Sequence, residues 1–308
     1  MSNREPTDIS ASVKQRLLNL QRRTGEPFDL ILLQYASERF LYRLTKSRFS
    51  DRFVLKGAML LIHWIDKPHR PTRDVDMLGF VENSAAAISV AIKDILGTHV
   101  QEDGLVFDTS SVQVEPIREE AEYGGMRAKL KCCLGKATIT LQVDIGFGDA
   151  PGRLEEITLR PMLDQPAPVM RAYPMETVIA EKFHAMVEKG IANSRMKDFI
   201  DVWLLSQEFD FAGKSLAEAI EATFKSRGLS LPIENPVALT DEFSSDTDKI
   251  AQMRSFIADK TNLKGASAEL AEIVDELRDF LMPVVGAILD GSAEHMTWTA
   301  GGPWKKTT

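Results

Sequence analysis

The period of the hydrophobic pattern changes twice along this chain, and this constrains the fold more than any other feature. Residues 11–48 carry apolar side chains at helical spacing, residues 111–145 alternate at period two, and the pattern is helical again from residue 175. Alternation predicts strands with one buried face, and the turn Leu134-Gly135-Lys136 predicts a hairpin. The sequence therefore predicts an α+β chain, in which helices flank a mixed sheet and an all-helical part follows.

Shorter segments complete this outline. Residues 53–55 and 74–78 have the pattern of strands, and residues 58–65 and 84–97 that of helices, the second with Ser84 as its N-cap. The other expected strands and helices are 111–117, 125–134, 137–145, 175–189, 194–207, 214–225, 241–261 and 267–290.

A cluster of prolines suggests where the chain divides. We place one domain over residues 1–150, a proline-bearing connector over 151–174 and a helical domain over 175–290. Residues 291–308 are expected to form an irregular tail.

Composition is typical of globular proteins and excludes other classes. Of 308 residues, 44% are hydrophobic and 27% are charged, which is too apolar for a disordered chain. The longest apolar runs, such as 280–289, are shorter than the roughly 20 residues of a membrane span. The first ten residues lack the apolar stretch of a signal peptide, and the adjacent Cys132 and Cys133 cannot build a disulfide framework. We therefore expect a cytoplasmic protein with no membrane partner.

Charge is distributed unevenly. The net charge is −8, but residues 1–73 hold 14 Lys or Arg against 7 Asp or Glu, a net of +7 that leaves −15 for the remainder. This asymmetry suggests one anion-facing surface, and ordinary solvated helix faces are the alternative. The residues that could form such a surface are Arg16, Arg22, Arg23, Arg39, Arg43, Lys46, Arg48 and Arg52.

The first chemical signal is Asp74-Val75-Asp76 on a predicted strand. Two carboxylates two positions apart lie on one face of a strand and repel each other unless a cation lies between them. Carboxylate oxygens on a rigid strand suit Mg²⁺, which binds through one or two carboxylates together with substrate phosphates. An exposed strand face is the alternative.

The neighbouring motifs strengthen this interpretation. Lys56-Gly57 ends one strand and opens a helix just upstream, and glycine allows a tight turn and a close backbone approach to phosphate. Asp144 lies at the end of the strand LQVDIGFGD. If that strand neighbours residues 74–78, Asp144 faces the same edge and could orient or deprotonate an attacking hydroxyl. A strand-end turn residue is the alternative for Asp144.

A second signal lies on two predicted helices. Lys182 lies on or beside the apolar face of METVIAEKFHAM, and Asp198 and Asp201 share a face of RMKDFIDVWLL. Lys182 either contacts nucleotide phosphates as a point charge or forms an ion pair with one of the two acids.

Together these segments resemble a known family. The four ordered motifs RFVLKGAMLLIHW…HRPTRDVDMLGF, VDIGFGD, ETVIAEKFHAMV and RMKDFIDVWLL are similar to those of the AbiEii-type nucleotidyltransferase toxins of toxin–antitoxin and phage-abortive systems. The resemblance runs from about Leu17 to Leu205. It implies a polymerase-β-like nucleotidyltransferase fold with an appended helical domain.

The resemblance also implies roles for single residues. Asp74 and Asp76 would hold Mg²⁺, and Asp144 would be the acid of the second strand. Lys182 would contact the nucleotide, and Asp198 would be the essential acid of the last motif. Asp201 would support Asp198.

The segment that would contact phosphate departs from the general nucleotidyltransferase pattern. Lys56 and Gly57 would form the glycine turn, but Ala58 follows where the pattern has Gly or Ser, so only its backbone N–H could contact phosphate. Thr72 and Arg73 precede the carboxylate pair and could contact substrate, with ordinary loop roles as the alternative.

The function implied is Mg²⁺-dependent transfer of an NMP from an NTP to an acceptor, with release of pyrophosphate. By resemblance the acceptor is tRNA, at its 3′ end, the consequence is arrested translation, and a cognate antitoxin is encoded nearby. Transfer to a protein hydroxyl and a catalytically inactive module that binds nucleotide or antitoxin are the alternatives.

Overall fold

The computed structural model describes residues 8–65, 72–117, 124–149, 152–258 and 269–306. These residues form two compact units. The first is built from the described parts of 8–148 and 155–172, and the second from those of 149–154 and 173–306.

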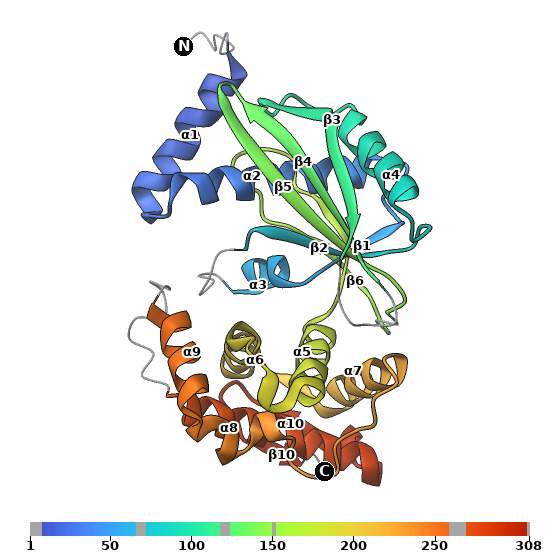
Figure 1. Ribbon diagram of the computed structural model, residues 1–308, viewed down its shortest axis with the longest axis vertical. Coiled ribbons are helices and arrows are strands. Elements are labelled where there is room, and N and C mark those ends of the chain that lie inside the picture. The colour runs from blue at the N-terminus through green and yellow to red at the C-terminus, as the bar shows by residue number, and fades with distance from the viewer. Residues whose placement is uncertain (1–7, 66–71, 118–123, 150–151, 259–268, 307–308) are drawn as a thin grey trace. The chain divides into compact units, whose positions relative to one another are not determined.

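The first unit is built on a sheet of seven strands in the order β3-β4-β5-β2-β1-β7-β6 (Figure 1). β2 pairs with β5, and β1 with β7, in parallel, and the other neighbours are antiparallel. The strands are β1 (Phe53–Lys56), β2 (Asp74–Gly79), β3 (Leu105–Pro116), β4 (Met126–Leu134), β5 (Ala137–Gly146), β6 (Glu155–Thr158) and β7 (Val169–Ala172).

Helices cover one face of this sheet. They are α1 (Ile9–Thr24), α2 (Phe28–Lys46) and α4 (Ala85–Gly97), while the short α3 (Ala58–Trp64) follows β1. Along β4 and β5, apolar side chains that include Leu130 and Leu141 are buried, whereas the polar residues between them are exposed or half-buried. The hydrophobic core therefore lies between the sheet and the helices, as the period-two pattern predicted.

Part of the predicted basic surface belongs to this core. Arg39 is 1% exposed and Arg43 7% exposed. Arg43 pairs with the buried Asp103 at 2.5 and 3.1 Å, and Arg39 pairs with Glu38 at 2.6 Å. The prediction that both arginines face an anionic partner is therefore wrong, because each one neutralises a buried acid instead.

The second unit is mainly helical. Its helices are α5 (Met175–Lys189), α6 (Met196–Glu208), α7 (Gly213–Ser226), α8 (Asp241–Ser245), α9 (Thr247–Ala258) and α10 (Leu270–Asp290). Short 3₁₀ turns lie between α5 and α6 and between α7 and α8. Asp246 divides the single helix expected over 241–261, because its carboxylate accepts hydrogen bonds from the N–H groups of Asp248 and Lys249 and caps α9. In the part of the chain that the structure describes, no helix combines the length and apolarity that crossing a membrane requires.

Two segments differ from the expectation. The segment expected to be a connector holds β6 and β7, which complete the sheet of the first unit. The tail holds β9 (Met296–Trp298) and β10 (Trp304–Lys306), which join β8 (Phe211–Ala212) in a small sheet. Trp298 and Trp304 fix this tail by packing on Phe280, with ring centroids 4.8 and 5.8 Å away. The predicted mixed sheet flanked by helices is confirmed, and helices dominate the part that follows it.

Candidate active site

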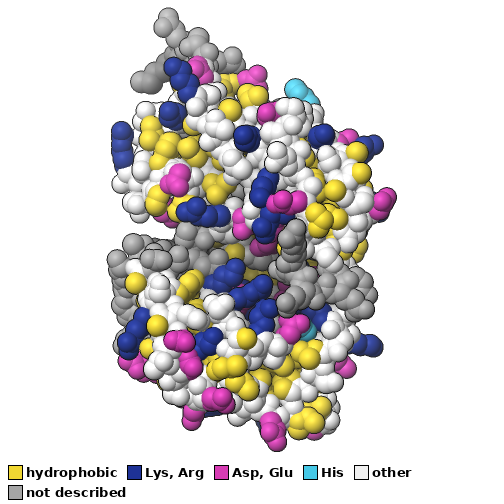
Figure 2. All heavy atoms as spheres, in the orientation of Figure 1, with side chains coloured by type: hydrophobic (Ala, Val, Ile, Leu, Met, Phe, Trp, Pro, Cys, Tyr) yellow, Lys and Arg dark blue, Asp and Glu magenta, His cyan; other side chains and the backbone are white. Residues whose placement is uncertain are grey.

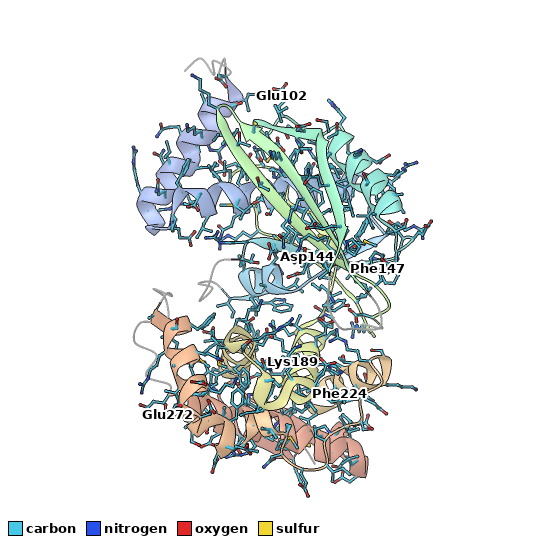
Figure 3. All side chains as sticks on the ribbon, viewed as in Figure 1. Glu102, Asp144, Phe147, Lys189, Phe224 and Glu272 are labelled. Carbon is cyan, nitrogen blue, oxygen red and sulfur yellow. The ribbon has the colours of Figure 1, made fainter. Side chains whose placement is uncertain are left out.

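The register of the sheet places five charged residues in one row. Lys56 of β1 pairs with Asp76 of β2, Asp76 with Asp144 of β5, Asp144 with Arg127 of β4, and Arg127 with Glu115 of β3. Residues directly opposite each other on neighbouring strands share a face of the sheet. The charged row therefore brings together three residues that the sequence singled out, Lys56, Asp76 and Asp144, from three different strands. Asp144 is labelled in Figure 3.

Gly57 follows Lys56 and lies directly against one of these carboxylates. Its backbone has φ 75° and ψ −153°, a region that is essentially restricted to glycine. A Cβ atom at this position would lie 2.7 Å from both Cβ and Cγ of Asp76. Both the backbone conformation and the lack of space beside Asp76 therefore require glycine at this position. Ala58, the next residue, begins α3 and is half-buried.

Asp144 is held by an arginine that the sequence analysis did not single out. Arg127 donates from Nε to Oδ1 at 2.8 Å and from Nη2 to Oδ2 at 2.7 Å, in a bidentate pair. The Asp144 side chain is 17% exposed and that of Arg127 33% exposed. The hydrogen bonds to Asp144 raise the pKa of Arg127 against the opposing effect of burial, and the charge of Asp74 adds to the increase. The alternation in MRAKLK places Arg127 on the polar face of its strand, and this was the available signal.

Asp74 occupies the next row of the same face. It pairs with Gln142, whose amide donates to Asp144 Oδ2 at 3.4 Å. Asp74 and Asp76 are both half-buried, and the intervening Val75 is fully buried. Thr72 donates its hydroxyl to the Asp74 carbonyl at 3.2 Å, which fixes the backbone at the start of β2, and Arg73 is exposed.

The chemistry of this donor set fits a magnesium ion. Asp74 and Asp76 present carboxylate oxygens on one face of a rigid strand, and Mg²⁺ typically takes one or two carboxylates and completes its shell with water and phosphate oxygens. Among the described residues, no group of three or more His, Cys, Asp or Glu side chains is arranged to hold a metal. The protein would therefore supply Asp74 and Asp76, and a bound substrate would supply the remaining ligands.

The second cluster of predicted residues lies in the helical unit. Lys182 of α5 contacts Asp198 at 2.6 Å and Asp201 at 2.8 Å, both on α6. The three side chains are 13%, 6% and 0% exposed. Burial lowers the pKa of Lys182, but the two carboxylates outweigh this effect and raise it overall. The cluster is thus a buried ion-pair network, which is one of the two roles expected for Lys182.

A glycine turn beside paired carboxylates on a mixed sheet is the arrangement that the resemblance to nucleotidyltransferases implies. A comparison with protein families agrees, since the family described as "Nucleotidyl transferase AbiEii toxin, Type IV TA system" matches residues 39–280. The chain belongs to this family. The match includes both the charged row and the Lys182 cluster.

Other comparisons add little detail. No protein with a curated description matches the chain. JHP933 from Helicobacter pylori is similar in structure at 17% identity, over 84% of this chain and 95% of that one, with a TM-score of 0.47. A second H. pylori structure, described as a candidate nucleotidyltransferase, is similar at 16% identity, over 83% and 97% of the two chains, with a TM-score of 0.46. The family membership is based on the sequence match.

Proposed function

We propose that this protein is a Mg²⁺-dependent nucleotidyltransferase that moves an NMP from an NTP to an acceptor and releases pyrophosphate. The observation that carries the proposal is the charged row, in which Asp76 lies against Gly57 and in register with both Lys56 and Asp144. Membership of the AbiEii family supports the same reaction class.

The residues in and beside the charged row have roles that follow from their positions. Asp74 and Asp76 would hold Mg²⁺, which neutralises charge on the transferring phosphate. Gly57 allows the backbone to pass close to Asp76, and Lys56 adds a positive charge at the end of the row. These groups position a triphosphate for in-line attack by an acceptor hydroxyl.

Asp144 and Arg127 act as a pair in this proposal. Both carboxylate oxygens of Asp144 are already engaged, because each accepts a hydrogen bond from the Arg127 guanidinium. We therefore assign to Asp144 the orientation of Arg127 and of the acceptor hydroxyl, in preference to proton abstraction. Arg127 would then present its remaining N–H donors to phosphate oxygens.

The Lys182 cluster favours a structural role over contact with the nucleotide. All three side chains are buried, and each carboxylate already has the lysine as its partner. In this proposal the cluster holds α5 against α6. Asp198, which the family resemblance makes essential, would be required because it stabilises this contact between the two helices.

The proposed acceptor and partners are those that the family resemblance implies. We propose tRNA, modified at its 3′ end, as the acceptor and arrested translation as the consequence, with neutralisation by a cognate antitoxin. A type IV toxin–antitoxin family supports the antitoxin. Arg16, Arg22 and Arg23 are half-buried or exposed and remain available to an RNA backbone. Transfer to a protein hydroxyl is the second candidate.

A transfer assay tests the proposal. The protein is incubated with Mg²⁺, total tRNA and each labelled NTP in turn, alongside Asp74→Ala and Asp76→Ala. Both variants should lose at least about a hundredfold in rate, because each removes a group that stabilises the transferring phosphate. Asp108→Ala is the matched control, since Asp108 is an exposed carboxylate on β3 outside the row.

The outcome distinguishes the candidate functions. Label in RNA only with intact Asp74 and Asp76 supports the proposal and identifies the nucleotide. Label in protein without RNA favours the second candidate. Nucleotide binding without transfer to any acceptor would favour an inactive binding module, and full activity of either variant would contradict the metal assignment.

A further inference from the structure

Helix α1 carries positive charge without any acid of its own. Between Ile9 and Thr24 it contains four basic residues and no Asp or Glu. Val13 and Leu17 are buried and hold the helix on the first unit, so the polar side of the helix faces outward. Arg22 and Arg23 lie in the last turn, where they also complement the helix dipole.

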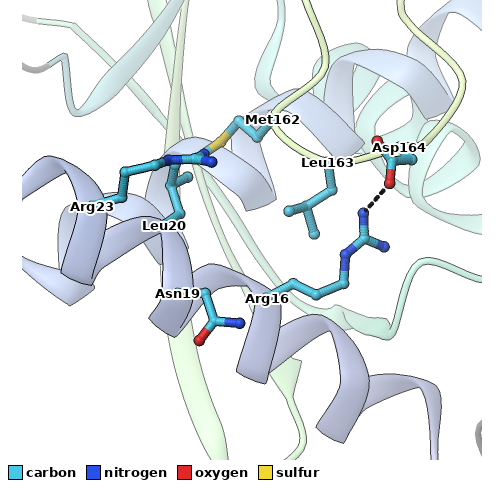
Figure 4. Close-up of a pocket in the computed structure, with 7 residues that line it drawn as sticks. All are labelled: Arg16, Asn19, Leu20, Arg23, Met162, Leu163 and Asp164. Carbon is cyan, nitrogen blue, oxygen red and sulfur yellow. Dashed lines mark hydrogen bonds and ion pairs between the residues drawn. The ribbon is translucent and has the colours of Figure 1, made fainter.

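A pocket of about 250 Å³ opens beside this helix, between α1 and the loop that joins β6 to β7 (Figure 4). Arg16, Asn19, Leu20 and Arg23 line it from one face of α1, since these positions are three or four residues apart. Met162, Leu163 and Asp164 line it from the loop. Figure 4 shows Arg16 and Arg23 extending from the helix toward that loop.

Side chains of α2 hold in place the loop that lines the pocket. The Glu38 carboxylate accepts a hydrogen bond from the N–H of Met162 at 2.6 Å, and Arg39 donates to the carbonyl of Pro166 at 2.8 Å. Glu38 and Arg39 are 5% and 1% exposed. Because two buried charged side chains of α2 hold the loop backbone, the pocket is formed before any ligand arrives.

The rim of the pocket contains an exchangeable carboxylate. Arg16 donates to Asp164 at 2.9 Å, but the Asp164 side chain is fully exposed. Such surface pairs contribute little, so an incoming phosphate can replace Asp164 on the guanidinium. Half-buried Leu20 and Leu163 offer an apolar surface beside the two arginines, suited to a sugar or a base.

We propose that this pocket binds one nucleotide unit of a polynucleotide acceptor, with its phosphate on Arg16 and Arg23, at a place separate from the charged row. The inference builds on the proposed function for the identity of the acceptor, but the binding itself needs no catalysis. Figure 2 shows basic and acidic side chains mixed on this face of the first unit, whereas helix α1 itself contributes basic residues and no acidic ones. A polyanion is therefore favoured at α1.

Binding of a labelled RNA oligonucleotide to the full chain, measured by fluorescence anisotropy, tests the inference. The double variant Arg16→Gln with Arg23→Gln should weaken binding by at least about tenfold and reduce the salt dependence by roughly 0.7 per lost phosphate contact. The matched control is Lys93→Gln with Lys136→Gln, which removes the same charge from exposed positions of the first unit outside the pocket lining. The control should lose clearly less affinity.

A third variant gives a change in the opposite direction. Asp164→Asn removes the carboxylate that competes for Arg16, so RNA should bind more tightly to it than to the natural chain. A gain larger than that from Glu26→Gln, which neutralises an exposed acid outside the pocket lining, separates the release of Arg16 from the general loss of negative charge. Thermal unfolding of each variant checks that the fold is intact, which is expected because both partners of the pair reach the surface.

Three results would contradict the inference. Equal losses in the pocket variant and the control would assign binding to diffuse charge and overturn the pocket. Competition by polyglutamate as effective as by RNA would assign the surface to an acidic protein partner instead. If a nucleoside monophosphate binds to the pocket and RNA does not, the ligand is a free nucleotide and the inference of a polynucleotide is wrong. A natural chain that binds RNA through the pocket yet transfers no nucleotide to any acceptor would refute the proposed function alone.

Discussion

Gly57→Ala tests the geometry of the candidate active site at a single atom. The backbone at Gly57 has φ 75° and ψ −153°, and holding a residue with a side chain there costs about 1–3 kcal/mol. The added Cβ would also lie 2.7 Å from Cβ and Cγ of Asp76, a separation that real Cβ atoms essentially never show. Either the turn or the Asp76 side chain must move.

Two other glycines separate these effects. Gly25 has φ 77° but nothing within 4 Å of an added Cβ, so Gly25→Ala measures backbone strain alone, about 1–2 kcal/mol. Gly97 closes α4 with no positive φ and open space around it, so Gly97→Ala should stabilise the protein slightly, by about 0.5–1 kcal/mol. Gly57→Ala should lose more free energy of unfolding than Gly25→Ala.

Activity provides the second readout. A displacement of about 1 Å at a catalytic group can cost on the order of a hundredfold in rate, so Gly57→Ala should lose most NMP transfer while Gly25→Ala and Gly97→Ala keep it. Urea unfolding and the transfer assay, run on the same preparations, give both quantities. The reasoning is refuted if Gly57→Ala is as stable as Gly25→Ala and transfers at the natural rate.

Two further predictions concern the helical unit. Lys182→Met should lower the free energy of unfolding, measured in urea, by about 3–5 kcal/mol, because the buried Asp198 and Asp201 lose the cation that they share. Unchanged stability with weaker NTP binding would instead support nucleotide contact. Burial, aided by the charge of Arg227, lowers the pKa of His184 below its ordinary value of 6.5. As the pH falls below 6.5, the unfolded chain therefore takes up a proton at this residue before the folded protein does. The stability that neutral His184 contributes is complete above pH 6.5 and is lost below it. His184→Leu should therefore flatten the pH dependence of unfolding below pH 6.5, and an identical slope in the two proteins would exclude this residue as the cause.

Local patterns were sufficient for most elements of the fold. The N-cap at Ser84 was predictable because capping depends on neighbouring residues, and its hydroxyl indeed accepts from the N–H of Ala87 at 3.2 Å. Alternation identified β4 and β5 for the same reason. The segment of β6 and β7 was not recognised as part of the sheet, since four-residue strands among prolines carry little periodic signal and gain their stability from distant partners.

The site was predictable residue by residue but not as an arrangement. Asp74 and Asp76 stand out within three positions, whereas their relation to Asp144 depends on the parallel pairing of β2 with β5. The pairing of Arg127 with Asp144 depends on one further register, between β4 and β5, that no local pattern specifies. Burial of Arg39 was hidden for a similar reason, because its partners include the distant backbone of Pro166.

The parallel pairing of β2 with β5 also sets the order in which the site can come into being during synthesis. A ribosome adds roughly 5–20 residues per second, so Asp74 and Asp76 leave it several seconds before Asp144 does. The strand that finally supports β1 from its other side, β7, ends only at Ala172. A nascent chain therefore carries Asp74 and Asp76 before the neighbouring strand β5 has been made. If the finished protein attacks translation, this delay would leave the ribosome that makes it unaffected until most of the chain has been built.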